Sequence, residues 1–331
     1  MTIVVTGAAG FIGAHLTRAL LARGERVVGV DSLNDYYPVT LKEARLGLFR
    51  DDPAFTFVRA DIADPDAIGG LFTRLEARGQ PITGIAHLAA QAGVRYSLTN
   101  PYAYVQANVM GQVVMLEAAR RLSHLRHLVY ASSSSVYGAN TKLPFAEDDR
   151  VDRPVSLYAA SKRSAELISH TYSQLYGLPA TGLRFFTVYG PWGRPDMAPW
   201  LFTEAITRGE PIRLFNNGRM RRDFTYIGDI VAGVTAALDR PPEPDADGVR
   251  HRVYNLGNHQ AEELGRFVAI LEQAIGRPAI RRLEPMQPGD VEATFADIEA
   301  SRRDLGFAPG TSLEDGLPRF VSWYKGYHGL A

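Results

Sequence analysis

The feature that most constrains the fold is a Gly-x-x-Gly-x-x-Gly turn at residues 7–13. It follows a short, mostly β-branched run at 2–6 and precedes a segment at 14–23 whose apolar residues have helical spacing. A second apolar run, 26–30, ends in Asp31. Such runs are typical of buried parallel strands, so these segments predict one strand–helix–strand unit.

The glycine turn also predicts a ligand. Gly7, Gly10 and Gly13 leave backbone N–H groups at a helix N-terminus open to a pyrophosphate, which side chains would obstruct. Asp31 follows at the sequence separation typical of the acid that binds an adenosine ribose. Its negative charge would repel the 2′-phosphate of NADP and therefore favours NAD. Asp61, after the next strand-like run, is a candidate for the adenine amino group. An ordinary structural turn and a helix-capping Asp31 are the alternatives.

Strand-like and helical segments continue to alternate along the first half of the chain. Further strands are expected at 55–60, 82–90, 127–132 and 180–186, and further helices at 108–122 and 157–176. This alternation predicts an α/β fold with a doubly wound, Rossmann-type parallel sheet. After residue 190 the pattern becomes irregular. We therefore expect an NAD-binding Rossmann domain at 1–190, joined by part of 221–235, and a smaller C-terminal substrate-binding domain at 191–331.

Tyr158 and Lys162 stand four residues apart, on one face of an expected helix. An ammonium beside a phenol favours the phenolate, as does the positive nicotinamide ring of an oxidised cofactor. Tyr158 is therefore a candidate general base. Four serines, 132–135, follow an expected strand at the end where open α/β sheets bind ligands. Tyr-x-x-x-Lys alone is typical of a surface pair; the glycine turn and the serines favour a catalytic interpretation.

Composition excludes several other classes. Lysine and arginine total 36, and aspartate and glutamate total 36, so no global basic field gathers nucleic acid or anionic lipid. Cysteine is absent, which excludes disulfides and thiolate chemistry, and the scattered histidines predict no catalytic metal. No apolar run is long enough to cross a bilayer. We expect a soluble cytoplasmic protein with neither a nucleic-acid nor a membrane partner.

Together these features resemble the extended short-chain dehydrogenase/reductase family, also called the NAD-dependent epimerase/dehydratase family. Within it the chain is most similar to the UDP-glucuronic acid 4-epimerases. The segments that carry this resemblance are 31–37, 87–97, 132–138 and 186–197, and 222–224 and 288–290 extend it through the second half. The longest, Phe-Thr-Val-Tyr-Gly-Pro-Trp-Gly-Arg-Pro-Asp-Met, is an unusual string and therefore a specific signal.

The resemblance implies C4 epimerisation of UDP-glucuronic acid to UDP-galacturonic acid through a 4-keto intermediate, with tightly bound NAD. Tyr158 would be the base, Lys162 its partner and Ser133 the hydroxyl donor. Ser134 and Ser135 stand where related dehydratases and decarboxylases carry acids, which argues against dehydration and weakens decarboxylation. A UDP-glucuronate decarboxylase, a neutral UDP-sugar 4-epimerase and a non-catalytic NAD-sensing scaffold stay open. Family members are often homodimers through a four-helix contact, which the two long helices could form.

The resemblance and the patterns above define three sets of site residues. The expected catalytic residues are Tyr158, Lys162, Ser133 and Ser134. The expected cofactor residues are Gly7, Gly10, Phe11, Ile12, Gly13, Asp31, Asn34, Asp61, Ile62, Leu88, Ala89, Ala90, Tyr158 and Lys162. The expected UDP-sugar residues are Arg95, Ser133, Ser134, Ser135, Thr187, Arg194, Leu214, Phe215, Arg222, Gln287 and Asp290.

A uronic sugar brings a hazard, because its 4-keto intermediate is a β-keto acid that loses CO₂ when the breaking bond aligns with the carbonyl. Fixed polar contacts must hold the carboxylate out of that alignment. Thr187, Arg194 and the serines at 132–135 are the candidates, and Arg194 is suited to the task because a guanidinium grips a carboxylate in a fixed plane. Arg95 is a weaker candidate, and a surface or diphosphate-pairing role is the alternative for Arg194. Leu214 and Phe215 are equally typical of a uracil slot and of core packing.

Overall fold

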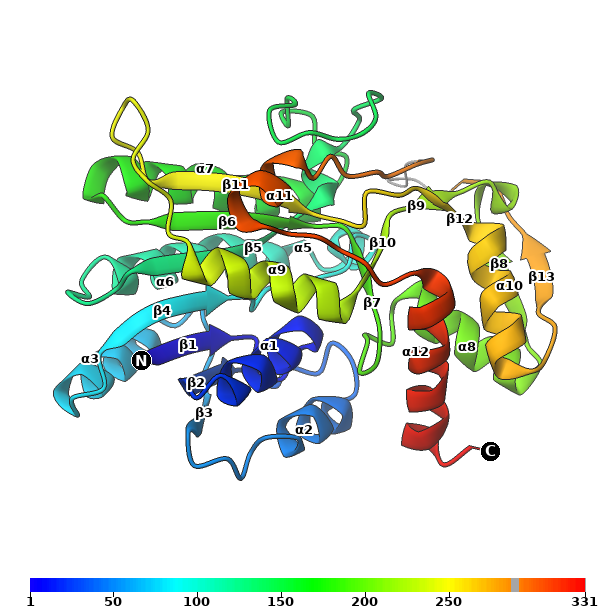
Figure 1. Ribbon diagram of the computed structural model, residues 1–331, viewed down its shortest axis with the longest axis horizontal. Coiled ribbons are helices and arrows are strands. Elements are labelled where there is room, and N and C mark those ends of the chain that lie inside the picture. Colours follow the sequence, from blue (N-terminus) through cyan, green and yellow to red (C-terminus); the bar gives the residue numbers. More distant parts are fainter. Residues whose placement is uncertain (287–291, 331) are drawn as a thin grey trace.

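The computed structural model describes residues 1–286 and 292–330. Its centre is a seven-stranded parallel sheet, with strand order β11-β6-β5-β4-β1-β2-β3 (Figure 1). The strands are β1 (Thr2–Thr6), β2 (Arg26–Asp31), β3 (Phe55–Arg59), β4 (Ile82–His87), β5 (His127–Ser133), β6 (Ala180–Phe185) and β11 (His251–Leu256). This architecture confirms the predicted doubly wound Rossmann-type sheet.

The order of the strands reverses beside β1, which pairs with β2 on one side and with β4 on the other. In open parallel sheets such a switch point leaves a crevice at the carboxyl ends of the strands, where ligands bind. The glycine turn leaves β1 at this crevice. The last strand of the sheet, β11, comes from 251–256, so the chain returns to the first domain beyond the expected 221–235.

Helices cover both faces of the sheet. One face carries α1 (Phe11–Ala22), α2 (Val39–Gly47), α9 (Ile227–Asp239) and α11 (Glu299–Leu305). The other carries α3 (Pro65–Ala77), α6 (Gly111–Ala119) and α7 (Leu157–Tyr176). Short segments α4 (Tyr96–Thr99), α5 (Pro101–Tyr104) and the π-helix η1 (Val105–Met110) precede α6. Two apolar cores result, one on each side of the sheet.

A third core lies in the remaining elements, which stand beyond the carboxyl ends of the strands at the right of Figure 1. Its helices are α8 (Ala198–Arg208), α10 (Leu264–Ile275) and α12 (Leu313–His328). Two-stranded pairings join β8 (Pro211–Leu214) to β13 (Ile280–Leu283), β9 (Arg221–Arg222) to β12 (Glu262–Glu263) and β7 (Thr187–Tyr189) to β10 (Phe224–Tyr226). Single turns occur at η2 (Ser134–Tyr137) and η3 (Asn216–Gly218).

The helix expected at 108–122 differs from the structure. Its first part belongs to η1, and a regular α-helix, α6, begins only at Gly111. Asn108 explains the change, because its side chain is buried and bonds both the backbone of Gln91 and the hydroxyl of Ser161. π-Helical segments of this kind occur frequently at functional sites. Hydrophobic spacing along the sequence carries no signal for such a contact.

No helix in the described part of the chain combines the length and the apolar character that a bilayer crossing requires.

Candidate active site

A cavity of about 680 Å³ opens at the switch point, between the sheet and the elements beyond it. Most of the residues predicted from sequence line it. They are Gly7, Gly10, Phe11, Ile12, Gly13, Asp31, Asn34, Asp61, Ile62, Leu88, Ala89, Ala90, Ser133, Ser134, Ser135, Tyr158, Lys162, Thr187, Arg194 and Arg222. The structure thus brings the glycine turn, the serines and the Tyr-Lys pair to one cavity.

The glycine turn fits a dinucleotide for steric reasons. Gly7 has φ +73°, and a Cβ there would lie 2.8 Å from the backbone nitrogen of Ala89. A Cβ on Gly13 would lie 2.0 Å from the carbonyl oxygen of Gly7. α1 begins at Phe11, three residues earlier than its apolar spacing predicts, so Gly13 lies in its first turn. Only glycine lets the helix N-terminus come this close to the strands, where its dipole and N–H groups favour a pyrophosphate.

Asp31 lies at the end of β2, on the cavity wall. Its carboxylate accepts backbone N–H bonds from Ala9 at 3.1 Å and from Leu33 at 2.9 Å. Each carboxylate oxygen has a second lone pair, which a ribose hydroxyl can use. Next to it, Lys42 donates to the backbone and side-chain oxygens of Asn34, both at 2.7 Å. Burial lowers the pKa of Lys42.

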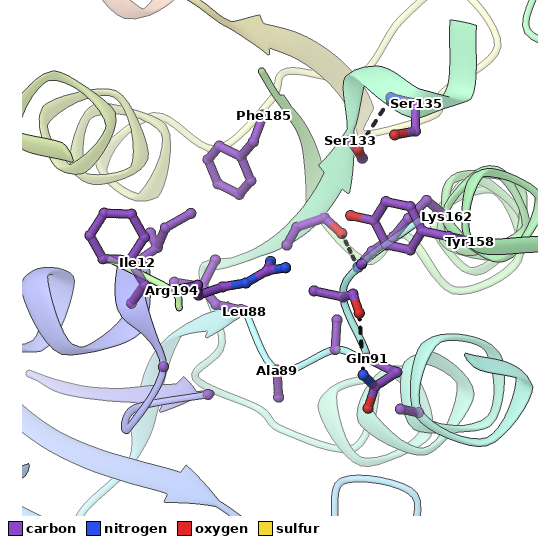
Figure 2. A pocket seen from close by; sticks show the side chains of 18 of the residues that line it. Ile12, Leu88, Ala89, Gln91, Ser133, Ser135, Tyr158, Lys162, Phe185 and Arg194 are labelled. Atoms are coloured by element: carbon purple, nitrogen blue, oxygen red, sulfur yellow. Dashed lines mark hydrogen bonds between the residues drawn. The ribbon is translucent and has the colours of Figure 1, made fainter. Parts of the chain in front are cut away.

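Tyr158 lies in the first turn of α7, whose start is fixed by Ser156. The Ser156 hydroxyl accepts the backbone N–H of Ala159 at 3.1 Å, as an N-cap residue does. One turn further, the Lys162 ammonium donates to the carbonyl oxygen of Ala131 in β5 at 3.0 Å. Figure 2 shows Tyr158, Lys162 and the nearby Ser133 on one side of the cavity. The helix and β5 therefore place the three groups together.

Burial raises the pKa of Tyr158, while a hydrogen bond with Ser133 and the positive charge of Arg194 act to lower it. Burial also lowers the pKa of Lys162 to about 8, against the attraction of Glu166. From the sequence, Lys162 was expected to acidify the phenol. In the structure the lysine ammonium is directed to the Ala131 carbonyl, and the groups that favour the phenolate are Ser133 and Arg194.

Arg194 reaches into the cavity near Leu88, with its guanidinium directed toward the side that holds Tyr158 (Figure 2). The same guanidinium pairs with the carboxylate of Asp196 through two bonds, one of them 2.9 Å from Nε to Oδ1. The Tyr36 hydroxyl donates to that carboxylate at 3.0 Å. Arg194 is therefore held in place by the protein itself, and part of its charge is already balanced.

Three expected substrate residues, Arg95, Leu214 and Phe215, do not line the cavity. Leu214 is buried in the third core, because β8 turns its side chain toward the helices there. The guanidinium of Arg95 instead stacks over the ring of Phe215, 4.5 Å from its centroid, and that of Arg213 lies 5.1 Å from the same centroid. For Leu214 the structure shows the core-packing alternative. Gln287 and Asp290, also expected to contact substrate, lie outside the described residues.

A buried hydrogen-bond network that includes Ser132 was not predicted from the sequence. Ser132 donates to Glu166 at 2.6 Å, and Arg184 donates to both carboxylate oxygens of Glu166 at 2.8 and 3.0 Å. Glu166 stands four residues after Lys162 on α7, so helical spacing was a signal available in the sequence. The hydrogen bond from Tyr36 to Asp196, the partner of Arg194, had no such signal, because 160 residues separate Tyr36 from Asp196.

A family model described as the NAD dependent epimerase/dehydratase family matches residues 3–257. The chain belongs to this family, as its sequence predicted. A probable UDP-glucuronate 4-epimerase of Rhizobium meliloti (strain 1021) is 48% identical over 98% of this chain and 97% of its own.

Solved structures agree with this assignment. The UDP-glucuronic acid 4-epimerase of Bacillus cereus, in complex with UDP-glucuronic acid and NAD, is 35% identical with a TM-score of 0.89, over 99% of this chain and 100% of that one. A UDP-glucose 4-epimerase of Thermotoga maritima with UDP-glucose is 28% identical, with a TM-score of 0.87 over 99% and 100% of the two chains.

Proposed function

We propose that this protein catalyses the NAD-dependent C4 epimerisation of UDP-glucuronic acid to UDP-galacturonic acid through a 4-keto intermediate. The observation that carries the proposal is that Tyr158, Ser133 and Arg194 line the same cavity as the glycine turn. Relatives with this activity in their names match almost the whole chain.

The glycine turn and Asp31 hold the dinucleotide, and the Lys162 ammonium is available to its nicotinamide ribose. NAD, when bound, accepts the hydride from C4 and returns it, and its oxidised ring adds positive charge that favours the Tyr158 phenolate. The Tyr158 oxygen takes the proton of the C4 hydroxyl and later returns it to the same oxygen, after the 4-keto sugar has turned its opposite face toward the nicotinamide side of the cavity. Ser133 donates a hydrogen bond to the same sugar oxygen. Arg222, at the cavity wall, is assigned to the diphosphate.

Retention of the carboxylate is assigned to neutral and cationic groups. Ser134, Ser135 and Thr187 line the cavity with hydroxyls, and Arg194 supplies a guanidinium that Asp196 and Tyr36 keep in a fixed plane. A carboxylate gripped in this way fixes the direction of the C5–C6 bond, and so keeps that bond out of alignment with the π system of the C4 carbonyl. No carboxylate side chain stands at 133–135, where an additional acid or base would serve dehydration.

The direct test is incubation of the purified protein with UDP-glucuronic acid, followed by NMR of the sugar. UDP-galacturonic acid is the expected product. A UDP-pentose would identify a decarboxylase, and turnover of UDP-glucose alone would identify a neutral-sugar epimerase. A scaffold would give no turnover and no transient near-ultraviolet absorbance from reduced NAD. Any of these three results would overturn the proposal.

We further propose that the protein is a homodimer. Apolar side chains stand exposed on α4, α5 and η1 and on the adjacent α7, with Tyr102 84% and Leu175 65% exposed. Pairing of these helices with a second copy would cover them and produce the four-helix contact expected from the sequence. Sedimentation of the wild type and of a Leu175→Arg variant tests this, because a monomeric wild type contradicts it. A cytoplasmic location stays a prediction of the sequence.

A further inference from the structure

Arg45, on α2, is a buried cation to which the proposed reaction assigns no role. Its side chain is fully buried, and all five of its N–H groups are used. They donate to the backbone oxygens of Ala9, Trp192 and Gly193 and to the Tyr37 hydroxyl, at 2.7 to 3.1 Å. Burial of a charge is costly unless every donor is satisfied, so this arrangement fixes the guanidinium strongly.

The oxygens that Arg45 binds belong to two segments that line the cavity through other residues. Ala9 lies inside the glycine turn, and Trp192 and Gly193 immediately precede Arg194. One side chain therefore ties the glycine turn to the segment that carries the Arg194 guanidinium. His15 of α1 adds a second tie, because its Nε2 lies 2.9 Å from the carbonyl oxygen of Pro191.

The tied segment adopts a backbone conformation that needs support. Trp192 has φ +64°, in the left-handed region that bulky residues rarely adopt, and such a residue persists only where its surroundings impose it. Its ring packs 5.1 Å from that of Trp323 and 5.6 Å from that of Tyr327 on α12. Arg45 holds the carbonyl on the other side. The segment is thus clamped between the cofactor domain and α12.

We propose that Arg45 is a positioning residue: it docks the 190–196 segment onto the glycine turn, so that Arg194 is presented to the sugar of the bound nucleotide. This inference rests on the proposed function for the identity of that sugar. It assigns Arg45 no contact with substrate.

The test is Arg45→Lys, which keeps the charge but cannot make five bonds in the plane of a guanidinium. We expect kcat/KM for UDP-glucuronic acid to fall about 10- to 100-fold, as for a small misplacement of a binding group. We also expect a larger share of decarboxylated product. Arg266→Lys, an arginine of α10 that pairs with Glu262 and Glu314, is the matched control and should change neither quantity.

A double-mutant cycle separates positioning from general damage. In an Arg194→Ala background, Arg45→Lys should have little further effect, because the group through which it acts is gone. Full additivity of the two substitutions would overturn the proposal. If Arg45→Lys does not fold, His15→Ala replaces it, because alanine cannot keep the bond to Pro191; the same direction and a smaller change are expected. An unchanged kcat/KM and product ratio in a folded His15→Ala protein would then count against the proposal.

Hydrogen–deuterium exchange of 190–197 gives a readout that does not need turnover. Arg45→Lys should accelerate exchange in this segment at least tenfold, while the segments of α10 and α12 keep their rates. Unchanged exchange in this segment would contradict the proposed docking by Arg45, even if the Arg45→Lys variant stays active. If instead the wild type does not epimerise UDP-glucuronic acid but exchange responds as expected, the proposed function fails and the clamp stands.

Discussion

At the scale of single residues, Tyr158 has the most sharply defined task. Burial raises the pKa of its phenol, whereas the hydrogen bond with Ser133 and the positive charge of Arg194 act to lower it. We expect Tyr158→Phe to lower kcat by about 10²- to 10⁴-fold, the usual contribution of a general base. Bound NAD, measured in an acid extract, should be unchanged. A variant with near wild-type turnover would show that the base is another group.

Thr187 permits a test of carboxylate retention without disturbing the ion pair of Arg194. Its side chain lines the cavity beside the serines. Thr187→Ala should raise the share of decarboxylated pentose product several-fold, because one hydrogen bond, worth about 1 kcal/mol, is lost from the carboxylate. Thr187→Ser keeps the hydroxyl and is the control. NMR of the products measures the ratio, and equal ratios in both variants would remove Thr187 from this role.

At the scale of elements, the junction between β1 and α1 gives a prediction on cofactor binding. A Cβ at Gly13 would lie 2.0 Å from the Gly7 carbonyl oxygen, so Gly13→Ala must push α1 away from the strand. We expect the purified variant to retain less than about a tenth of the wild-type NAD, because the N–H groups no longer converge on the pyrophosphate. Extraction and chromatography of the nucleotide provide the measurement.

The control for this substitution is Gly69→Ala in α3, where an added Cβ has no neighbour within 4 Å. That variant should keep its NAD and gain up to about 1 kcal/mol, since alanine is the better helix former. Equal NAD contents in the two variants would show that the close approach of α1 is not what binds the cofactor.

Local signals predicted elements well where their ends are capped. The helix expected at 157–176 occurs with those bounds, because Ser156 caps its start and Gly177, at φ +66°, ends it. The helix expected at 108–122 begins instead with η1, since Asn108 bonds to residues distant in the sequence. Capping is local and visible in the chain, whereas such contacts form only after folding.

At the scale of the whole molecule, buried histidines predict how stability depends on pH. Burial lowers the pKa of His15, His127 and His251 to about 4 and that of His87 to about 3. The folded protein keeps these rings neutral, whereas the unfolded chain takes up protons below about pH 6.5. The unfolded state then binds more protons, so stability falls as the pH falls from 6.5 toward 4.

Each of these histidines contributes up to about 1.4 kcal/mol per pH unit in that window. Urea unfolding at pH 7.5 and 5.5 should therefore give a clearly lower midpoint at pH 5.5. His127→Gln, which can keep the bond to Thr181, should show a shallower dependence. If the free energy of unfolding is the same at both pH values, the rings are not held neutral.

The sequence by itself determined strands β1 to β6 of the sheet, the glycine turn with Asp31, and the Tyr158–Lys162 pair, because each depends on residues close together in the chain or on strand ends that meet at one edge. Only the tertiary structure decided that Tyr36 bonds Asp196, the partner of Arg194, that Arg45 joins the glycine turn to the segment before Arg194, and that Leu214 packs in a core. The contacts of Tyr36 and Arg45 join segments far apart along the chain. Such contacts depend on how the domains pack. That packing cannot be predicted from hydrophobic spacing or from turn residues, because both are local patterns.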